Sequence, residues 1–398
     1  MEKIIEKYQR RIENTQTRFV RSLMDDINWN ARLIGIKGSR GVGKTTLILQ
    51  YIKLFLSHKI DETLYVSLDN IWFSENRLTD LADDFYKRGG RYLFVDEVHK
   101  YPDWSVELKN IYDDYPEMKI VFTGSSLLEI LNARSDLSRR AVVYTMQGLS
   151  FREFLNMQLD IKFDKISLGD IIDNHLSVSR RIVVQLQPLK YFDTYLKKGY
   201  YPYFTEFDDL YYSRIEEVVN MILEIELPQL RNVNIAWIPK LKQIMLIVAE
   251  TAPFVPNISK LSQRVGINRE TMLAYIWNLN QAHLLANVYR NASGISKLKK
   301  PDKLFLENPN LMYALGGFNI NQGNVRETFF VNQLKYRHKI EMAAKGDFLV
   351  DSKYIFEIGG KNKKNHQIKD EENAYIAADN IEYGSHNRIP LWLFGFLY

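Results

Sequence analysis

Short apolar runs alternate with longer amphipathic stretches through the first 150 residues. The runs are typical of buried strands and lie at residues 32–37, 63–68, 92–95, 119–123 and 141–145. After a helical lead-in over residues 1–30, apolar residues recur at helical spacing at residues 45–57, 77–87 and 104–114. Because strands and helices alternate, we expect an α/β fold with a parallel sheet covered by helices on both faces.

The middle of the chain shows mostly helical spacing. Residues 150–235 indicate helices with aromatic-rich connections, which is typical of a lid or linker. Three further helical patterns follow, at residues 241–250, 258–265 and 269–279. Gly266 to Asn268 form a turn between the last two, and strands at residues 283–289 and 303–306 can pair after them. This order of elements predicts a helix-turn-helix with a wing.

The last part of the chain returns to mixed spacing. Residues 325–398 indicate helix, strand, strand, helix and strand in that order. The apolar run at residues 391–397 is expected to form a buried terminal strand.

The composition is that of an ordinary globular chain. It has 398 residues, of which 46% are hydrophobic and 25% charged, and its length suggests two or three domains. Cysteine is absent, which excludes disulfides, a thiolate nucleophile and a cysteine-ligated zinc. The net charge of +5 permits contact with nucleic acid without requiring it. The start is charged and no apolar run approaches the ~18 residues of a membrane span, so we expect a cytoplasmic protein without membrane contact.

A glycine-rich motif separates the first expected strand from the helix after it. It fits GxxxxGK(S/T) and comprises Gly38, Ser39, Arg40, Gly41, Val42, Gly43, Lys44 and Thr45, followed by Thr46. Such a loop turns backbone N–H groups inward and adds the positive end of a helix dipole, which together hold phosphate oxygens. We therefore predict an ATP site, with Lys44 on the β- and γ-phosphates and the Thr45 hydroxyl on Mg²⁺. An ordinary glycine turn is the alternative.

Two carboxylates follow the third expected strand. Asp96 and Glu97 come directly after the apolar run at residues 92–95. A phosphate-binding loop needs such a pair, because Asp96 can hold Mg²⁺ through its water shell and Glu97 can accept a proton from the attacking water. Strands that end in acids are common, so this prediction depends on the pairing with the glycine-rich loop.

Hydroxyl groups and arginines follow the fourth expected strand. Thr123 or Ser125 can orient the attacking water, and a simple helix cap is the alternative. Arg139 and Arg140 precede the fifth strand. Acting on a neighbouring subunit, Arg140 can neutralise charge on the transferred phosphoryl group, whereas the alternative is a solvated surface arginine.

These residues resemble a group of bacterial and archaeal AAA-like ATPases that carry a C-terminal restriction-endonuclease-like domain of unknown function. Besides the motifs above, the resemblance rests on residues 64–69, 92–98, 123–126, 149–154 and 199–202. Where that group has Gly-Arg, this chain has Arg139 and Arg140, so the arginine is kept and the glycine is not.

The resemblance implies four segments along the chain. They are a P-loop ATPase domain at residues 1–160, a helical lid or linker at 161–235, a winged helix at 236–318 and a nuclease-like α/β domain of the PD-(D/E)xK type at 319–398.

The expected winged helix offers residues for DNA contact. Asn268, Arg269, Glu270 and Thr271 begin the second helix and can face a DNA groove. The wing carries lysines suited to phosphate contact, namely Lys297, Lys299, Lys300 and Lys303. A packing module with a solvated charged loop has the same sequence features.

The expected nuclease-like domain has acids but lacks the motif lysine. Asp347 and Glu357 fit the strand carboxylates, and Glu327 on the preceding helix can be a third Mg²⁺ ligand. The motif requires lysine at position 359, which is Gly359, and Lys361 lies roughly 6–7 Å further along a strand. An active nuclease and a degenerate module that only binds therefore both stay open.

Three interpretations follow. The first is an ATPase that acts as a nucleotide-driven switch or motor on DNA or a protein partner, and that self-associates if Arg140 acts in trans. The second is an ATP-dependent DNA nuclease that uses Glu327, Asp347 and Glu357. The third is a scaffold that binds ATP, turns it over slowly and signals through assembly.

Overall fold

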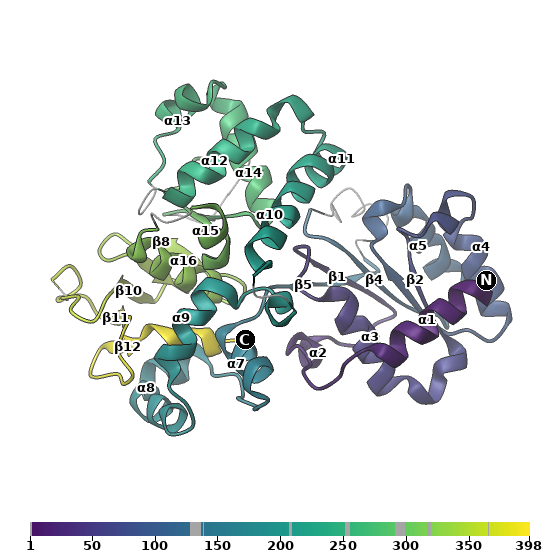
Figure 1. Cartoon of the computed structure of the whole chain (residues 1–398), viewed down its shortest axis with the longest axis horizontal. Coiled ribbons are helices and arrows are strands. Elements are labelled where there is room, and N and C mark those ends of the chain that lie inside the picture. The colour runs from purple at the N-terminus through teal and green to yellow at the C-terminus, as the bar shows by residue number, and fades with distance from the viewer. Residues whose placement is uncertain are drawn as a thin grey trace. The chain divides into compact units, whose positions relative to one another are not determined.

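The chain divides into two compact units, Met1–Gly148 and Leu149–Tyr398 (Figure 1). The computed structural model describes residues 2–127, 137, 139–206, 209–250, 255–290, 299–316, 320–364 and 366–398. The finer division into four segments stays a prediction.

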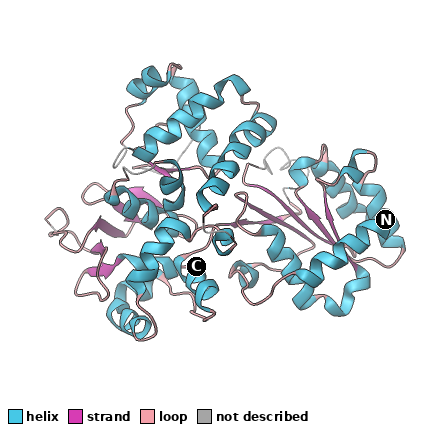
Figure 2. Ribbon diagram, in the orientation of Figure 1, coloured by secondary structure: helices cyan, strands magenta, loops and turns pink. Residues whose placement is uncertain are grey.

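The first unit is built on a five-stranded sheet whose neighbouring strands are all parallel (Figure 2). Its strands are β1 (Leu33–Gly38), β2 (Thr63–Ser67), β3 (Tyr92–Asp96), β4 (Lys119–Ser125) and β5 (Val142–Met146). Their order in the sheet is β2-β3-β4-β1-β5. Each strand lies close to its expected position, so the predicted parallel sheet is confirmed.

Helices cover both faces of this sheet. They are α1 (Glu2–Asn14), α2 (Leu23–Asp26), α3 (Lys44–Phe55), α4 (Leu78–Lys87) and α5 (Trp104–Asp114), with 3₁₀ turns at Ser57–Glu62, Ile71–Ser74 and Val98–Lys100. On one face, Leu93 and Val95 of β3 belong to a core that includes residues of α4 and α5. On the other face, the ring of Phe94 lies 6.1 Å from that of Tyr51 in α3. Alternating side chains of a strand point to opposite faces, so each face of β3 has its own helical cover.

The second unit begins with helices, as the spacing predicts. They are α7 (Phe151–Leu159), α8 (Leu168–Val183), α9 (Pro188–Lys198), α10 (Tyr211–Met221) and α11 (Leu227–Arg231), with a π-helical turn at Ile222–Glu226 and 3₁₀ turns at Pro202–Thr205 and Ile235–Trp237. Ser150 begins α7 with a capping box, because its hydroxyl accepts from the Glu153 N–H at 3.1 Å while Glu153 accepts from the Ser150 N–H at 3.3 Å.

Three helices and an antiparallel strand pair come next, in the expected order. They are α12 (Ile238–Glu250), α13 (Ile258–Val265), α14 (Arg269–Gln281), β6 (Leu285–Val288) and β7 (Lys303–Leu306). Gly266 ends α13 with a φ of 70°, which favours glycine. The Asn268 side chain accepts from the Thr271 N–H at 2.8 Å and so caps α14 instead of extending from it. The winged-helix interpretation of these elements stays a prediction, and Lys297 lies outside the described residues.

A mixed five-stranded sheet ends the second unit. After α15 (Pro309–Leu315) and α16 (Gln322–Leu334) come β8 (Ile340–Met342), β9 (Phe348–Val350), β10 (Tyr354–Gly359), β11 (Ala374–Ala378) and β12 (Arg388–Pro390). The order is β12-β11-β10-β9-β8, with parallel pairs from β10 to β12 and antiparallel pairs from β8 to β10.

Two expectations about this region were wrong. The described residues between β10 and β11 form turns and no helix, because Ile368 is the single buried side chain there and no apolar stripe exists to dock a helix. The apolar end is buried as expected, but Leu391–Phe396 form a 3₁₀ helix instead of a strand. A short, fully apolar run has no period that distinguishes a strand from a buried helix.

The 3₁₀ helix at the end of the chain gives a stability test. A Cβ added at Gly395 would lie 2.4 Å from the Phe151 Cβ and 3.3 Å from the Phe329 ring. We expect Gly395→Ala to lower the free energy of unfolding by about 1–3 kcal/mol, measured by urea denaturation. Gly169→Ala is the matched control, because the nearest atom to its added Cβ is the Ser167 Oγ at 3.8 Å. Equal stability of the two variants would contradict this packing.

Candidate functional site

The glycine-rich loop connects β1 to α3 as its motif predicts. Gly41 and Gly43 have φ values of 80° and 98°, in the region that favours glycine. Gly43 is the residue before the first turn of α3, where backbone N–H groups lack helical partners. Thr46 continues α3 and is exposed. The loop therefore presents backbone N–H groups at the start of a helix, which is the arrangement that binds phosphate oxygens.

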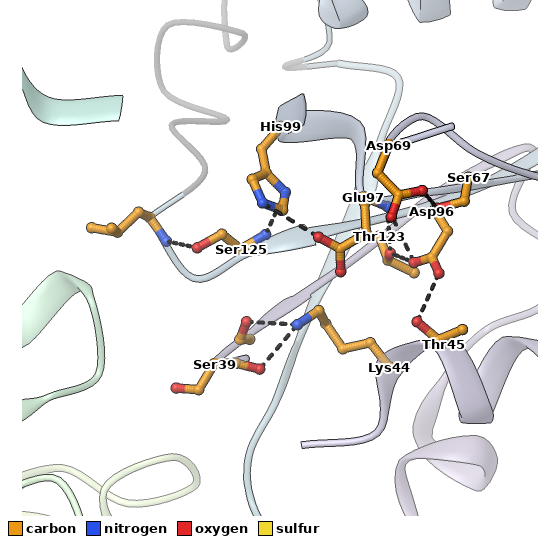
Figure 3. A network of polar contacts seen from close by, with 12 residues as sticks. Ser39, Lys44, Thr45, Ser67, Asp69, Asp96, Glu97, His99, Thr123 and Ser125 are labelled. Atoms are coloured by element: carbon orange, nitrogen blue, oxygen red, sulfur yellow. Dashed lines mark hydrogen bonds and ion pairs between the residues drawn. The ribbon is translucent and has the colours of Figure 1, made fainter. Parts of the chain in front are cut away.

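Lys44 is folded onto this loop (Figure 3). Its buried amine donates to the Gly38 carbonyl at 2.9 Å and to the Ser39 carbonyl at 3.0 Å. A lysine ammonium has three donors. The amine is therefore held at the loop by backbone oxygens, at the place where the sequence predicts a contact with phosphate.

Asp96 lies at the end of β3 and is 2% exposed. Its Oδ2 accepts from the Thr45 hydroxyl at 2.7 Å and from the Tyr65 hydroxyl at 2.8 Å. Its Oδ1 accepts from the Thr123 hydroxyl and from the Glu97 N–H, the latter at 3.2 Å. The structure thus brings together Thr45 and Asp96, the two residues that the sequence predicts to share Mg²⁺.

Glu97 has an unusual backbone and a partner that the sequence analysis missed. Its φ is 55°, which is uncommon for a residue other than glycine. Its Oε2 lies 3.3 Å from the Nε2 of His99, whose side chain is 3% exposed. The Nδ1 of His99 accepts from the Ser125 N–H at 3.3 Å, so the ring proton belongs on Nε2, facing Glu97. His99 therefore connects Glu97 to the end of β4 (Figure 3).

The two hydroxyl candidates of β4 have different surroundings. Besides its bond to Asp96, the Thr123 oxygen accepts from the Glu97 N–H at 3.2 Å, so this side chain supports both acids. The Ser125 Oγ accepts from the Leu127 N–H at 3.3 Å. The orientation of water by either hydroxyl stays a prediction.

Arg140 forms a bidentate ion pair within its own chain. Its Nε and Nη2 each lie 2.9 Å from an oxygen of Asp113 in α5. This hydrogen-bonded arginine lowers the pKa of Asp113. Arg140 would have to leave Asp113 to reach a neighbouring subunit, and its trans role stays a prediction.

An open cavity of about 980 Å³ lies beside these acids. Its lining includes Arg40 of the glycine-rich loop together with Thr45, Asp96 and Glu97, and also residues of α1 such as Arg11. Ser67 and Asp69 also line the cavity, and they share a hydrogen bond of 2.6 Å (Figure 3). The contribution of α1 was not predicted, because nothing in the amphipathic lead-in shows where the helix packs.

The acids of the second unit form an ion network with lysines. The Lys303 amine lies 2.9 Å from Glu327 and 3.4 Å from Asp347, and the Lys363 amine lies 3.0 Å from Glu357. Lys303 is 6% exposed, so its assignment to an exposed basic wing was wrong. It faces α16 because the strand pair places it against the core.

This network was only partly predicted. Asp347 also accepts from the Ile358 N–H at 2.8 Å, which ties β10 to the residue before β9. Burial raises the pKa of Glu327, and Lys303 opposes that shift. Within the part of the chain that the structure describes, no group of three or more histidine, aspartate or glutamate side chains is arranged to hold a metal ion. The same described residues contain no helix that is long and apolar enough to span a membrane.

Two family models match parts of the chain. Residues 30–155 match a family described as an AAA domain. Residues 189–322 match a domain of unknown function, DUF8612. The first match and the parallel sheet support an AAA-like domain over residues 30–155. The second match covers most of the expected lid and winged helix, and the restriction-endonuclease-like fold of residues 319–398 stays a prediction.

Similar proteins add little about function. The uncharacterized protein MJ1637 of Methanocaldococcus jannaschii is 26% identical over 292 residues, which cover 70% of this chain and 61% of that protein. This chain therefore matches less than two thirds of its relative's length. A solved structure of C. elegans PCH-2 aligns with a TM-score of 0.26 and 17% identity, over 37% of this chain and 48% of PCH-2.

The buried His99 gives a test of pH dependence. The pKa of His99 is lowered from 6.5 to about 3, chiefly by burial and also by the charges of Lys100, Lys44 and Arg40, while Asp69 opposes the shift. The pKa of His99 is lower in the folded chain than in the unfolded chain. The contribution of neutral His99 to the free energy of unfolding is therefore fully present above about pH 6.5 and is lost as the pH falls toward 3. We expect the free energy of unfolding to fall less steeply over this range in His99→Asn than in wild type.

Urea denaturation at a series of pH values measures this difference. His58→Asn, a change at an exposed histidine, is the control and should keep the wild-type slope. Parallel curves for His99→Asn and wild type would show that His99 is not held neutral by its surroundings.

Proposed function

We propose that this chain binds ATP with Mg²⁺ on the loop at residues 38–46 and hydrolyses it. The observation that carries the proposal is the 2.7 Å contact between the Thr45 hydroxyl and the Asp96 carboxylate, at the start of α3 and the end of β3. These two oxygen groups have the chemistry that Mg²⁺ prefers, and they border an open cavity. Once bound, Mg²⁺ supplies positive charge to the β- and γ-phosphates.

The residues of the loop have separate roles in this proposal. The backbone N–H groups at Gly41 to Gly43 and the start of α3 bind phosphate oxygens. The Lys44 ammonium exchanges its carbonyl partners Gly38 and Ser39 for the β- and γ-phosphates. Arg40 lines the cavity and adds positive charge at the same end of the site.

Glu97 is the proposed general base. It accepts a proton from the water that attacks the γ-phosphate, and its position at the cavity wall gives it access to that water. The His99 Nε2 lies 3.3 Å from the Glu97 carboxylate, so the ring stands beside the proposed base, while the Ser125 N–H donates to the Nδ1 of the ring. Thr123 supports Asp96, which leaves Ser125 as the candidate for contact with the γ-phosphate or the water.

The ATP cycle is proposed to act as a switch or motor on DNA or a protein partner. Arg21 supports a switch, because it is buried and its guanidinium donates to the Val42 carbonyl of the loop at 2.7 Å. It also donates to the carbonyls of Gln147 and Gly148, both at 2.8 Å, at the end of the first unit. A change at the loop is therefore transmitted to the residues that lead out of the ATPase domain. Lys299 and Lys300 of the proposed wing suit a DNA partner.

Variants of Lys44 and Glu97 test the ATPase. Lys44→Ala should weaken ATP binding by about 10- to 100-fold, because charge-assisted hydrogen bonds to phosphate are lost. Glu97→Gln should retain ATP binding and lower the hydrolysis rate by about 10²–10⁴-fold, because the amide cannot accept the proton. Isothermal titration and phosphate release measure the two effects.

Glu75→Gln is the control, because Glu75 is exposed and is not among the residues lining the cavity. Normal hydrolysis by Glu97→Gln would refute its role as the base. Tight ATP binding by wild type with negligible turnover at every protein concentration would support the slow scaffold instead.

A second candidate activity is metal-dependent DNA cleavage by the second unit, proposed on one observation. A Cβ at Gly359 would lie 2.5 Å from the Lys363 Cγ, so Lys363 covers the position where the nuclease motif requires lysine. Its amine reaches Glu357, as the motif lysine would, whereas Lys361 has no such contact among the described interactions. Glu327, Asp347 and Glu357 are the proposed ligands, but the described acids are not arranged around a metal as they stand, so they would have to move together and Lys303 would have to release the first two.

Nicking of supercoiled DNA with Mg²⁺ or Mn²⁺ tests this activity. We expect Asp347→Ala and Lys363→Ala to lower nicking by at least about 100-fold while ATP hydrolysis stays unchanged. Lys364→Ala, at an exposed neighbouring lysine, should nick DNA as wild type does. A wild-type chain that leaves DNA intact at every metal concentration would show that the ion network is structural.

A further inference from the structure

Helix α1 makes a close contact with β2 next to the nucleotide site. The Nη1 of Arg11 donates to the Tyr65 hydroxyl at 3.1 Å. The rings of Tyr8 and Tyr65 stack with centroids 5.8 Å apart and an interplanar angle of 19°. The amine of Lys53 in α3 also donates to the Glu13 carbonyl at 2.8 Å, which holds the end of α1. Helix α1 therefore contacts Tyr65 at both its ring and its hydroxyl.

The Tyr65 hydroxyl in turn contacts the acid of the magnesium site. Tyr65 is 3% exposed, and its hydroxyl donates to the Oδ2 of Asp96 at 2.8 Å. This is the same oxygen that accepts from the Thr45 hydroxyl at 2.7 Å. Ser67, two residues after Tyr65, pairs with Asp96 in the strand register, so Tyr65 and Asp96 are diagonal neighbours on one face of the sheet.

We propose that Tyr65, held by Arg11 of helix α1, is a positioning residue that orients Asp96 for Mg²⁺ and makes α1 part of the nucleotide site. The proposal rests on the proposed ATP and Mg²⁺ site. The chain of donors runs from the Arg11 guanidinium to the Tyr65 oxygen, and from the Tyr65 hydroxyl to the Asp96 carboxylate.

The physical reason lies in what Oδ2 has to do. The Thr45 hydroxyl donates its hydrogen to Oδ2 of Asp96, which leaves the lone pairs of the Thr45 oxygen for the cation. The position of Oδ2 therefore sets the orientation of the Thr45 hydroxyl. When one of the two donors to an oxygen is removed, the carboxylate rotates more freely about the Cβ–Cγ bond of the aspartate. The guanidinium of Arg11 polarises the Tyr65 hydroxyl, and hydrogen bonds in such a chain strengthen one another.

A purely structural role for Tyr65 makes a different prediction. The stack with Tyr8 and the burial of the ring fix α1 on the sheet whether or not the hydroxyl is present. Tyr65→Phe keeps the ring and the stack and removes the hydroxyl alone. The effect on Mg²⁺ therefore separates positioning from packing.

The test compares the ATP affinity of the full chain with Mg²⁺ and with EDTA, by isothermal titration. Tyr65→Phe should lower the Mg²⁺-dependent gain in affinity by about three- to tenfold and leave the affinity in EDTA unchanged. Arg11→Ala, at an exposed residue, should lower the gain in the same direction, and the double variant should lose no more than Tyr65→Phe alone. Tyr8→Phe is the matched control, because no described residue hydrogen-bonds to its hydroxyl and its ring keeps the stack.

The outcomes separate this proposal from the proposed function. A full Mg²⁺ gain in Tyr65→Phe, or additive losses in the double variant, overturns the positioning role while the ATP site stands. A wild-type chain that binds ATP equally with Mg²⁺ and with EDTA overturns both the magnesium site and the positioning role. Binding that gains from Mg²⁺ without turnover overturns hydrolysis alone.

Discussion

The buried carboxylate of Asp96 is the group on which the site depends. A buried charge is tolerated when its oxygens are fully hydrogen-bonded. Thr45 and Tyr65 donate to one oxygen, and Thr123 and the Glu97 N–H donate to the other. These donors come from helix α3, strand β2, strand β4 and the turn after β3. Satisfying one acid thus fixes the relative positions of four elements.

The parallel sheet makes this convergence possible. In a parallel sheet the carboxyl ends of neighbouring strands meet at one edge, where α/β proteins bind their ligands. Strand β3 lies between β2 and β4, so Asp96 has a neighbour on each side, and the end of β1 supplies the loop that leads to Lys44 and Thr45. The Glu97 backbone then turns left-handed, which directs its side chain to His99 and the cavity.

The sequence predicted the parts of this site that motif spacing encodes. The glycine-rich loop, the pairing of Thr45 with Asp96 and the five parallel strands follow from local patterns. The contacts of Tyr65 and Arg11 could not be predicted in this way, because they depend on the strand order and on where α1 packs. No local pattern in the sequence contains that information. His99 stands three residues after Asp96, so its position was visible, but its contact depends on the backbone of Glu97. Lys303 was misplaced for the same reason, since only the packing of β7 on α16 shows that it is buried.

The donors that surround each set of acids determine what the two units can bind. In the first unit, hydroxyl and amide groups satisfy Asp96 without cancelling its charge, so the carboxylate keeps its attraction for a divalent cation. In the second unit, the ammonium groups of Lys303 and Lys363 pair directly with Glu327 and Glu357. A cation there has to displace a lysine or compete with its charge, although the second oxygen of Glu357 is buried and has no hydrogen-bond partner among the residues that the structure describes. Carboxylates are therefore available to a metal ion in the first unit and largely neutralised by lysines in the second. Of the two candidate metal sites, the ATP site has the better-supported ligands.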